Sequence, residues 1–224
     1  MEFRRAAVSL FLRTALNTIA RIDCREFVDA LKKNEPLLVI FNHVNFLEVP
    51  ILVAYSYPLF VTGIVKSETW NNPFFAFLFN TYKAIPIDRG GAFTESFKRA
   101  REAIDKGFYM CISPEGTRSK NGVLQRGRPG IIQLAFEAGV PILPVAHHGG
   151  ENIWKNIKKL KRTSFSFKAG APFRIRFNGK PGKEERDEIL SEVMGQMAKL
   201  LPEEMRGAYA EQAEAECKHL DFIL

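Results

Sequence analysis

Residues 37–50, LLVIFNHVNFLEVP, decide the fold of this 224-residue chain. The apolar run Leu37–Phe41 has the length and the branched side chains of a buried strand. Because the run ends in Asn42-His43, it places an imidazole at the carboxyl edge of a sheet, where open α/β folds bind their ligands. The stretch therefore predicts an α/β fold with a functional site at this strand end.

His43 and Glu48 have the spacing of a catalytic pair, with four residues between them. If a helix begins near Phe46, the Glu48 carboxylate can reach back to one ring nitrogen of His43 and leave the other facing a substrate. A His titrates near neutral pH, and a carboxylate partner fixes its tautomer and supports its charged form. The spacing predicts a general base, but alone it also fits a strand-end His with a solvated Glu nearby.

Composition favours a single globular domain with an N-terminal appendage, since the chain is 46% hydrophobic and 25% charged. The three cysteines, Cys24, Cys111 and Cys217, are widely separated and odd in number, so they predict a reducing compartment and no disulfide or metal site. No apolar run approaches the roughly 18 residues of a spanning helix, and no secretion signal is evident. We expect a protein of the cytosol or of a membrane surface.

The N-terminal segment predicts a helix over residues 3–21. Its polar side carries Arg5, Ser9 and Arg13 at intervals of four residues, and Phe11 and Leu12 lie on the other side. An Arg-rich polar face opposite an apolar face is typical of a helix lying in the membrane interface. The alternative is a helix packed on the domain with its Arg stripe in water. We accordingly divide the chain into an amphipathic membrane-interface helix, residues 1–22, and an α/β domain, residues 23–224.

Charge is unevenly distributed around the net value of +7. Residues 155–183 contain ten Lys or Arg and no acid, whereas residues 184–224 contain eleven acids and four bases. This pattern fits a face that meets lipid headgroups, phosphorylated substrates, an acidic carrier protein or nucleic acid, and it also fits a solvated basic face.

Strand and helix signals alternate after Pro50, which predicts βαβ units and one largely parallel, mixed sheet flanked by helices. Strands are expected at 59–66, 84–88, 108–113 and 142–146, with helices at 70–82, 94–106 and 131–138. Period-two alternation at 164–168 and 173–177 predicts antiparallel edge strands that pair with each other. Helices from Lys183 onward are expected to close the chain.

Further candidate residues fall at the predicted strand ends. Arg89, followed by two glycines, offers a fixed cation for a phosphate or simply ends a turn. Residues 113–119, SPEGTRS, can hold an anion through backbone N–H groups, a hydroxyl and a guanidinium. The pair His147-His148 either contacts a ligand or forms a polar turn. Cys111 lies inside an apolar strand, where cysteines are usually inert.

Four stretches together resemble a known family. They are His43–Glu48, Ile85–Gly90, Pro114–Ser119 and Val140–Val145, in the order of the four sequence blocks of the glycerolipid acyltransferase superfamily. Over roughly residues 37–148 the chain resembles the 1-acylglycerol-3-phosphate acyltransferases, and its most specific block is Pro114–Ser119. The resemblance implies acyl transfer from acyl-CoA or an acyl carrier protein thioester to the free hydroxyl of the lysophospholipid. The product would be phosphatidic acid, for phospholipid biosynthesis.

The resemblance also implies the role of each site residue. His43 would take the proton of the acceptor hydroxyl, and Glu48 would hold His43 and support its charged form. The phosphate would be bound by Lys66, Arg89 and Arg118. The acceptor-site loop would contain Glu115, Gly116 and Thr117. Direct transfer requires no cofactor and no metal, and the implied setting is peripheral and monotopic, on the cytoplasmic face of an anionic membrane.

Glu48 departs from the family, whose first block has Asp at this position. The extra methylene changes how the carboxylate meets the imidazole, and a misplacement of about 1 Å can cost of order a hundredfold in rate. Either the local backbone compensates, or the chain acts on another lysophospholipid or a glycolipid. A non-catalytic membrane- or nucleic-acid-binding role has the aromatic residues among the bases of 154–177 as its support. We expect no nucleic-acid partner, because a phosphate-and-stacking surface does not need a His–carboxylate pair.

Overall fold

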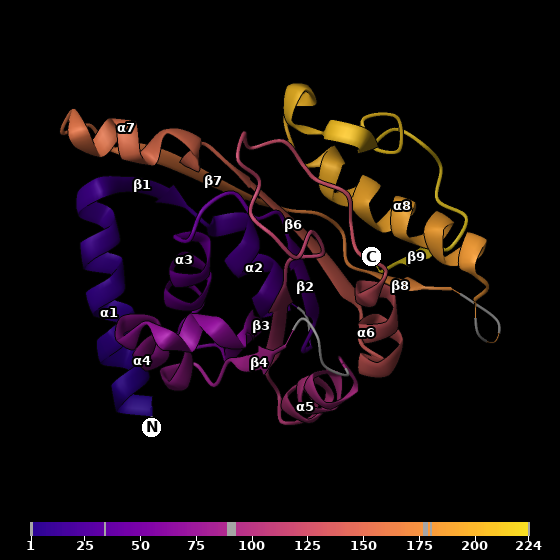
Figure 1. The fold of residues 1–224 in the computed structure, drawn as a ribbon, viewed down its shortest axis with the longest axis horizontal. Coiled ribbons are helices and arrows are strands. Elements are labelled where there is room, and N and C mark those ends of the chain that lie inside the picture. The colour runs from indigo at the N-terminus through magenta and orange to yellow at the C-terminus, as the bar shows by residue number, and fades with distance from the viewer. Residues whose placement is uncertain (1, 34, 89–92, 177–178, 180, 224) are drawn as a thin grey trace.

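The computed structural model describes residues 2–33, 35–88, 93–176, 179 and 181–223. The described strands form one nine-stranded mixed sheet with the order β1-β7-β6-β2-β5-β3-β4, and with β8 and β9 continuing from β6 (Figure 1). The strands are β1 Ala20–Asp23, β2 Leu38–Phe41, β3 Val61–Lys66, β4 Ile85–Ile87, β5 Tyr109–Ile112, β6 Ile142–His148, β7 Thr163–Ala169, β8 Phe173–Ile175 and β9 Leu220–Phe222.

Parallel pairing dominates the sheet, as the sequence predicts. Strand β2 lies parallel to β5 and β6, and β3 lies parallel to β5 and β4. The strands predicted at 164–168 and 173–177 are present as β7 and β8, but the prediction that they pair with each other was wrong. Strands β7 and β8 do not pair with each other; both lie antiparallel to β6, and β7 is covered on its other side by β1. Phe177, at the end of that predicted pair, lies outside the described residues.

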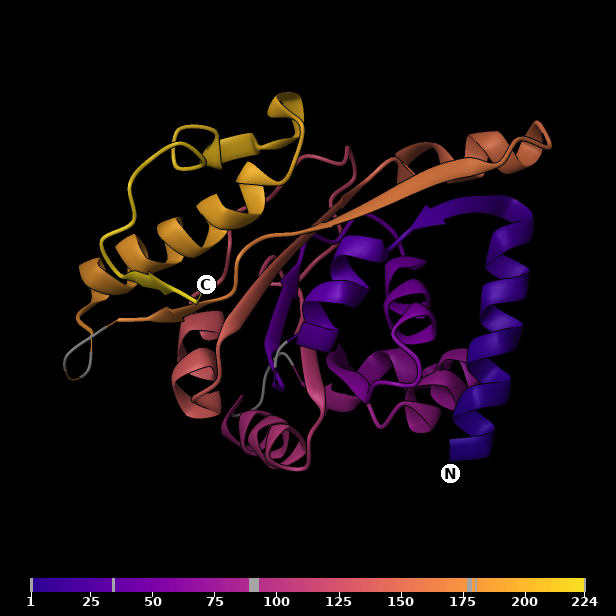
Figure 2. The same ribbon diagram turned by 180° about the vertical axis from the view of Figure 1, so that it is seen from behind.

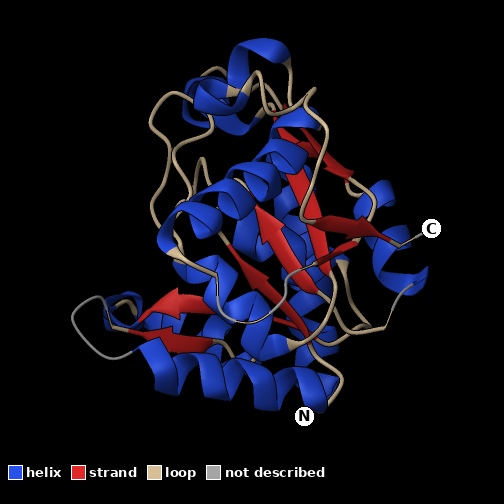
Figure 3. Ribbon diagram, turned by 90° about the vertical axis from the view of Figure 1, so that its right-hand side faces the viewer, coloured by secondary structure: helices blue, strands red, loops and turns tan. Residues whose placement is uncertain are grey.

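Helices cover both faces of the sheet (Figure 3). One hydrophobic core lies under α1, α2, α3 and α4, which gather on one side in Figure 2, and the other lies under α5, α6 and α8. The helices are α1 Glu2–Ile19, α2 Arg25–Lys33, α3 Glu48–Tyr55, α4 Pro73–Thr81, α5 Phe93–Asp105, α6 Gly130–Ala138, α7 Ile153–Lys158 and α8 Lys183–Lys199, with 3-10 turns at Ser67–Asn71, Gly150–Asn152, Glu203–Met205 and Gly207–Tyr209.

Local sequence explains where several helices begin and end. The Asn72 side chain accepts hydrogen bonds from the N–H groups of Phe74 and Phe75, and Pro73 occupies the first turn of α4. Helix α6 ends at Gly139, whose φ of +63° is the left-handed conformation that glycine adopts without strain.

Alternation along the central strands assigns each side chain to a face. In β2, Leu38 and Ile40 face the α5–α6–α8 core, whereas Val39 and Phe41 face the α1–α4 core. Because both faces of β2 are buried, its sequence is a continuous apolar run and does not alternate with polar residues. In β6, Leu143 and Val145 face the α1–α4 core, and the same parity directs His147 towards α3.

Helix α1 packs with its Arg stripe inward, which differs from the orientation expected for a headgroup-facing stripe. Arg5 is buried, donates to the Leu59 carbonyl at 2.7 Å and lies over the Phe60 ring. Arg13 donates to the carbonyls of Ala54, Tyr55 and Tyr57 at 2.8–3.2 Å. The carbonyls of Ala54 and Tyr55 end α3, and that of Tyr57 follows just after it, so the guanidinium supplies donors where the helix no longer does.

The chain beyond α8 differs from the predicted helical ending. It runs through two short 3-10 turns and adds β9 to the sheet beside β8. Among the described helices, none combines the length and the apolar character needed to cross a bilayer.

Candidate active site

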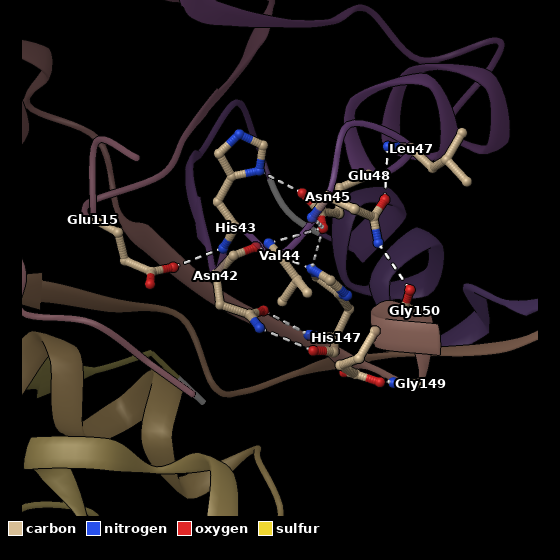
Figure 4. Close-up of polar contacts among 11 residues, drawn as sticks. Asn42, His43, Val44, Asn45, Leu47, Glu48, Glu115, His147, Gly149 and Gly150 are labelled. Carbon is tan, nitrogen blue, oxygen red and sulfur yellow. Dashed lines mark hydrogen bonds and ion pairs between the residues drawn. The ribbon is translucent and has the colours of Figure 1, made fainter. Parts of the chain in front are cut away.

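The sheet topology brings the predicted strand-end residues to one edge. Because β2, β5, β6, β3 and β4 are parallel, their carboxyl ends lie together, with β2 between β5 and β6. His43 therefore has the loop after β5 on one side and the end of β6 on the other. Figure 4 shows the resulting cluster.

The loop from β2 into α3 is closed by reciprocal hydrogen bonds. The Asn45 side chain accepts from the Leu47 N–H at 2.8 Å, and the Glu48 Oε1 accepts from the Asn45 N–H at 2.5 Å and from the Val44 N–H at 2.9 Å. As in a capping box, a Glu reaches back to the backbone just before the helix, although α3 itself begins at Glu48. The reach of Glu48 thus comes from its place in the first turn of α3.

Glu48 and His43 are in direct contact. The His43 Nδ1 lies 2.5 Å from Glu48 Oε2, while the Glu48 side chain is 0% exposed and the His43 side chain is 23% exposed. Burial alone would raise the Glu48 pKa. Hydrogen bonds from His147 and His43 outweigh it and lower the pKa to about 2. Glu48 is therefore an ionised acceptor for the imidazole.

The orientation of His43 suits a general base. With Nδ1–H donating to Glu48, the lone pair resides on Nε2, which points away from Glu48 in Figure 4. The contact predicted from the sequence spacing is thus present, with Glu in place of the family's Asp. It places a basic nitrogen at a partly exposed position of the sheet edge.

Glu115 is also beside His43 but binds the backbone. One carboxylate oxygen accepts from the His43 N–H at 2.6 Å and the other from the Gln125 N–H at 2.9 Å. The side chain is 2% exposed. Burial raises the Glu115 pKa to about 7, and the two backbone donors and His43 only partly offset it. One oxygen therefore connects the loop after β5 to the end of β2, and the other closes that loop on itself.

The rest of the Pro114–Ser119 block forms a tight loop around His43. The Ser119 N–H donates to the His43 carbonyl at 2.6 Å. Gly116 has a φ of +64°, and a Cβ there would lie 2.9 Å from the Arg128 side chain. Arg128 covers Gly116 and its Nε lies 3.3 Å from the Glu115 carbonyl. Thr117 is half-buried in the same loop, and Arg118 is exposed.

The predicted phosphate ligands Lys66 and Arg118 lie at different positions along this edge and differ in exposure. Lys66 is the last residue of β3, two strands from β2, and is half-buried opposite Ile87 of β4. Two strand spacings are roughly 10 Å. Arg118 belongs to the loop that follows β5, the strand between β2 and β3 in the sheet. Arg89 lies outside the described residues.

One cavity lies beside the site, and a larger one lies elsewhere along the sheet. A narrow apolar one of about 30 Å³ runs between α3, α4 and β3, with a lining that includes Phe41, Val49, Leu78 and Phe79. A larger one of about 800 Å³ lies between α8 and the ends of β6 and β7, and its lining includes Lys168, Lys199 and His148. Among the aromatic residues of α4, Phe79 lines the first cavity, whereas Phe74 and Phe77 are exposed.

Cys111 also lines the narrow cavity. Burial raises its thiol pKa to about 12, so the thiolate that a nucleophile needs is not formed near neutral pH. No group of three or more His, Cys, Asp or Glu side chains within the described ranges could hold a metal ion.

His147 is the site residue whose place sequence reasoning did not identify. Its Nε2 lies 3.1 Å from Glu48 Oε1. Alternation along β6 could have identified it. Because the odd-numbered residues of this strand face α3, His147 must face α3 too, whereas His148 points to the other side.

Comparison with known proteins relates the chain to lipid enzymes. The family model described as Acyltransferase matches residues 24–148. A 1-acyl-sn-glycerol-3-phosphate acyltransferase of Pseudomonas aeruginosa is 32% identical over 120 residues, covering 52% of this chain and 46% of the relative. One from Cocos nucifera is 30% identical over 145 residues, covering 63% and 47%. The chain therefore spans about half the length of each of these curated relatives.

A solved structure shares the fold. The 1-acyl-sn-glycerophosphate acyltransferase of Thermotoga maritima superposes with a TM-score of 0.61 at 19% identity, covering 96% of this chain and 81% of that one. At this identity the likeness concerns the arrangement of helices and strands.

Proposed function

Since this chain belongs to the Acyltransferase family, we propose that it transfers a fatty acyl group from an acyl thioester to the free hydroxyl of 1-acylglycerol-3-phosphate. The product is phosphatidic acid. The observation that carries the proposal is the 2.5 Å contact between His43 Nδ1 and the buried, ionised Glu48. This pair supplies what an alcohol nucleophile needs, a base of suitable tautomer with a fixed counter-charge.

The proposed reaction proceeds in two proton transfers. His43 Nε2 takes the proton of the acceptor hydroxyl as its oxygen attacks the thioester carbonyl. The imidazolium is stabilised by Glu48 during this step. When the tetrahedral intermediate collapses, the C–S bond breaks and His43 returns the proton to the leaving thiolate. The ester is formed and His43 is again neutral.

Lys66, Arg89 and Arg118 are proposed to bind the acceptor's phosphate. Lys66 and Arg118 extend from strand ends on the same edge as His43. In the described part of the chain, Arg118 makes no ion pair with an acid. Glu115, Gly116 and Thr117 are proposed to shape this acceptor-site loop, Glu115 through the backbone bonds described above. A phosphate held here leaves the acceptor's glycerol directed towards β2.

The acyl chain is proposed to enter the narrow cavity between α3 and α4. Its lining is apolar and includes Phe41 and Val49, which flank the His43–Glu48 loop on both sides in the sequence. Because about 30 Å³ holds no more than a water-sized group, binding of an acyl chain requires the side chains of Leu78 and Phe79 on α4 to move away from α3 and β3.

Peripheral membrane binding is proposed to use the outward faces of α1 and α4. Phe3, Leu10 and Phe11 of α1 are 87%, 68% and 64% exposed, and Phe74 and Phe77 of α4 are each 51% exposed. The two helices lie side by side, joined by a hydrogen bond from Arg4 to the Asn80 carbonyl (Figures 1 and 2). An apolar patch of this kind on a surface commonly marks an interaction site.

Helix α7 adds basic charge at the same end of the molecule. Trp154 is 54% exposed and Leu160 is 97% exposed among four lysines of residues 153–161. Arg162, just beyond, donates to the Ala20 carbonyl, next to the end of α1. Phe46 stacks on Trp154 at 5.5 Å and meets Phe75 of α4 edge-on. Lysines around exposed apolar side chains suit an anionic lipid surface, and the aromatic contacts connect that surface to the catalytic loop.

The reaction is tested by supplying acyl-CoA or an acyl carrier protein thioester with lysophosphatidic acid in detergent micelles. We expect phosphatidic acid from the wild type and a loss of at least about 10³-fold in His43→Ala. His219→Ala, which removes a His–Glu pair elsewhere, serves as the control. Folded wild-type protein that makes no phosphatidic acid with either donor would overturn the proposal. A panel of other lysophospholipids and glycolipids would then identify the alternative acceptor.

Membrane binding is tested by co-sedimentation with vesicles containing phosphatidylglycerol. Phe11→Ser is expected to weaken binding about tenfold, since burying one such side chain contributes roughly 1.5–3 kcal/mol. Phe136→Ser is the matched control, because Phe136 is 40% exposed on α6, on the other side of the sheet. Equal binding by both variants would contradict the proposed surface.

A further inference from the structure

We propose that His147 is a positioning residue for catalysis, which holds the Glu48 carboxylate in the orientation that His43 requires. The inference deepens the proposed function and rests on it. It concerns an imidazole that is 0% exposed and whose place beside Glu48 the His43–Glu48 pair alone does not explain.

Both oxygens of Glu48 face a histidine. Oε2 contacts Nδ1 of His43 at 2.5 Å, and Oε1 lies 3.1 Å from Nε2 of His147. Oε1 also accepts from the Val44 and Asn45 N–H groups. A carboxylate with donors on both oxygens cannot rotate without losing some of them. His147 comes from a different strand, β6, so its contact with Oε1 ties the catalytic loop to the sheet (Figure 4).

The surroundings of His147 determine its tautomer. The side chain is 0% exposed, and Nδ1 has no hydrogen-bond partner among the described residues. Nε2 lies 3.1 Å from the Asn42 carbonyl as well as from Glu48. Since both neighbours of Nε2 are acceptors, the hydrogen resides on Nε2. A second hydrogen on Nδ1 would leave a buried charged N–H without an acceptor, which is costly. We therefore assign the neutral Nε2–H form.

His147 is itself held rigidly. Its backbone N–H donates to the Asn42 Oδ1 at 2.8 Å, and its carbonyl accepts from the Asn42 Nδ2 at 2.9 Å. Its ring stacks on Phe167 and Phe165, with centroid distances of 5.1 and 6.5 Å. Asn42 thus extends the pairing of β2 and β6 by one residue. The donor to Glu48 is fixed by packing from both sides, as a positioning group requires.

The consequence for the reaction is electrostatic. Glu48 is fully buried, and burial favours its neutral form, which could not stabilise the imidazolium of His43. The titratable groups facing Glu48 are His43 from the β2 loop and His147 from β6, with the Glu115 charge near His43 on the other side. A neutral donor in the interior favours the ionised carboxylate without competing with His43 for its proton.

The test compares His147→Leu, which removes the donor, with His147→Gln, whose amide can replace it. For His147→Leu we expect kcat to fall about tenfold with little change in KM for lysophosphatidic acid. In His147→Gln, most of kcat should return.

A second readout does not depend on activity. In protein labelled with ¹³C at the Glu carboxyls, the Glu48 signal, identified by its loss in Glu48→Gln, is followed against pH. Its titration midpoint should rise by at least about one pH unit in His147→Leu and return in His147→Gln. If wild-type protein transferred no acyl group, the proposed function would fail while this titration still tested the His147–Glu48 contact.

His219→Leu is the matched control, because His219 Nδ1 lies 3.0 Å from Glu192 Oε1, between β9 and α8. It should lower stability without changing kcat or the Glu48 titration. A folded His147→Leu protein with wild-type kcat and an unchanged Glu48 midpoint would overturn the proposal and leave His147 a core residue. Equal impairment of the Leu and Gln variants would also overturn it, since the donor would then be irrelevant.

Discussion

Two buried glutamates flank His43, and their pKa values shift in opposite directions. The pKa of Glu48, at the start of α3, is lowered to about 2, whereas the pKa of Glu115, in the loop after β5, is raised to about 7. Burial raises both pKa values. The difference lies in the donors: two imidazoles contact Glu48, while among the described residues Glu115 accepts hydrogen bonds from backbone N–H groups alone.

The comparison separates two uses of a carboxylate within one site. Glu48 retains its charge and contacts the imidazole, so it can stabilise a proton that His43 takes up. Glu115 contacts the backbone of the same residue and fixes the loop that carries Arg118 to the end of β2. Variants of the two glutamates should therefore differ in kind, one affecting chemistry and the other affecting stability and acceptor binding.

The largest effect is expected for Glu48→Gln. Its amide oxygen can accept at one position, yet donors approach both oxygens of Glu48, so the amide nitrogen must face a donor. His43 then loses its counter-charge and favours the wrong tautomer. We expect kcat to fall on the order of 10²–10⁴-fold. Acyl transfer at saturating lysophosphatidic acid measures it, and a kcat within a few-fold of wild type would remove Glu48 from the mechanism.

A smaller loss is expected for Glu48→Asp, although Asp is the family's residue. In this chain the carboxylate reaches back from the first turn of α3 to His43, to two backbone N–H groups and to His147. A side chain that is one methylene shorter cannot make all of these contacts at once. We expect kcat to fall roughly 10–100-fold. Wild-type kcat in the Asp variant would show instead that the loop adjusts to either length.

Much of this site could be predicted from the sequence, because strand ends in a parallel sheet meet at one edge. The run Leu37–Phe41 and its His43 predicted both the buried strand and the contact with Glu48. The geometry of Glu115 could not be predicted. A carboxylate in a Gly- and Arg-rich loop fits a substrate contact as well as a backbone contact, and burial decides between them.

Helix α1 shows a second limit of pattern reasoning. The spacing of Arg5 and Arg13 correctly indicates one helical face. It does not show that Arg13 would find the terminal carbonyls of α3 or that Leu10 and Phe11 would be left outside. Those partners come from residues about 40 positions away, so only the tertiary structure reveals them.

The opposite pKa shifts predict separate pH windows for stability. The Glu115 pKa rises from 4.5 to about 7 on folding, so its contribution is full below about 4.5 and is lost as pH rises through 7. The Glu48 pKa falls, so its contribution is lost as pH drops from 4.5 towards 2. Urea unfolding should therefore show that, relative to Glu115→Gln, the wild type loses on the order of 1–3 kcal/mol between pH 5 and 8. A pH-independent difference would contradict the raised pKa.

The smallest effect is expected for Gly116→Ala, which disturbs the Glu115 loop without touching either carboxylate. The φ of +64° at Gly116 costs a non-glycine residue roughly 1–2 kcal/mol. The added Cβ would lie 2.9 Å from the Arg128 side chain, which must shift away. We expect a thermal midpoint a few degrees lower and a KM for lysophosphatidic acid raised about two- to fivefold, with kcat unchanged. The His43–Glu48 contact is made from another loop and should be unaffected. A fall in kcat as large as that of Glu48→Asp would show instead that a change in the Glu115 loop also displaces the His43–Glu48 pair.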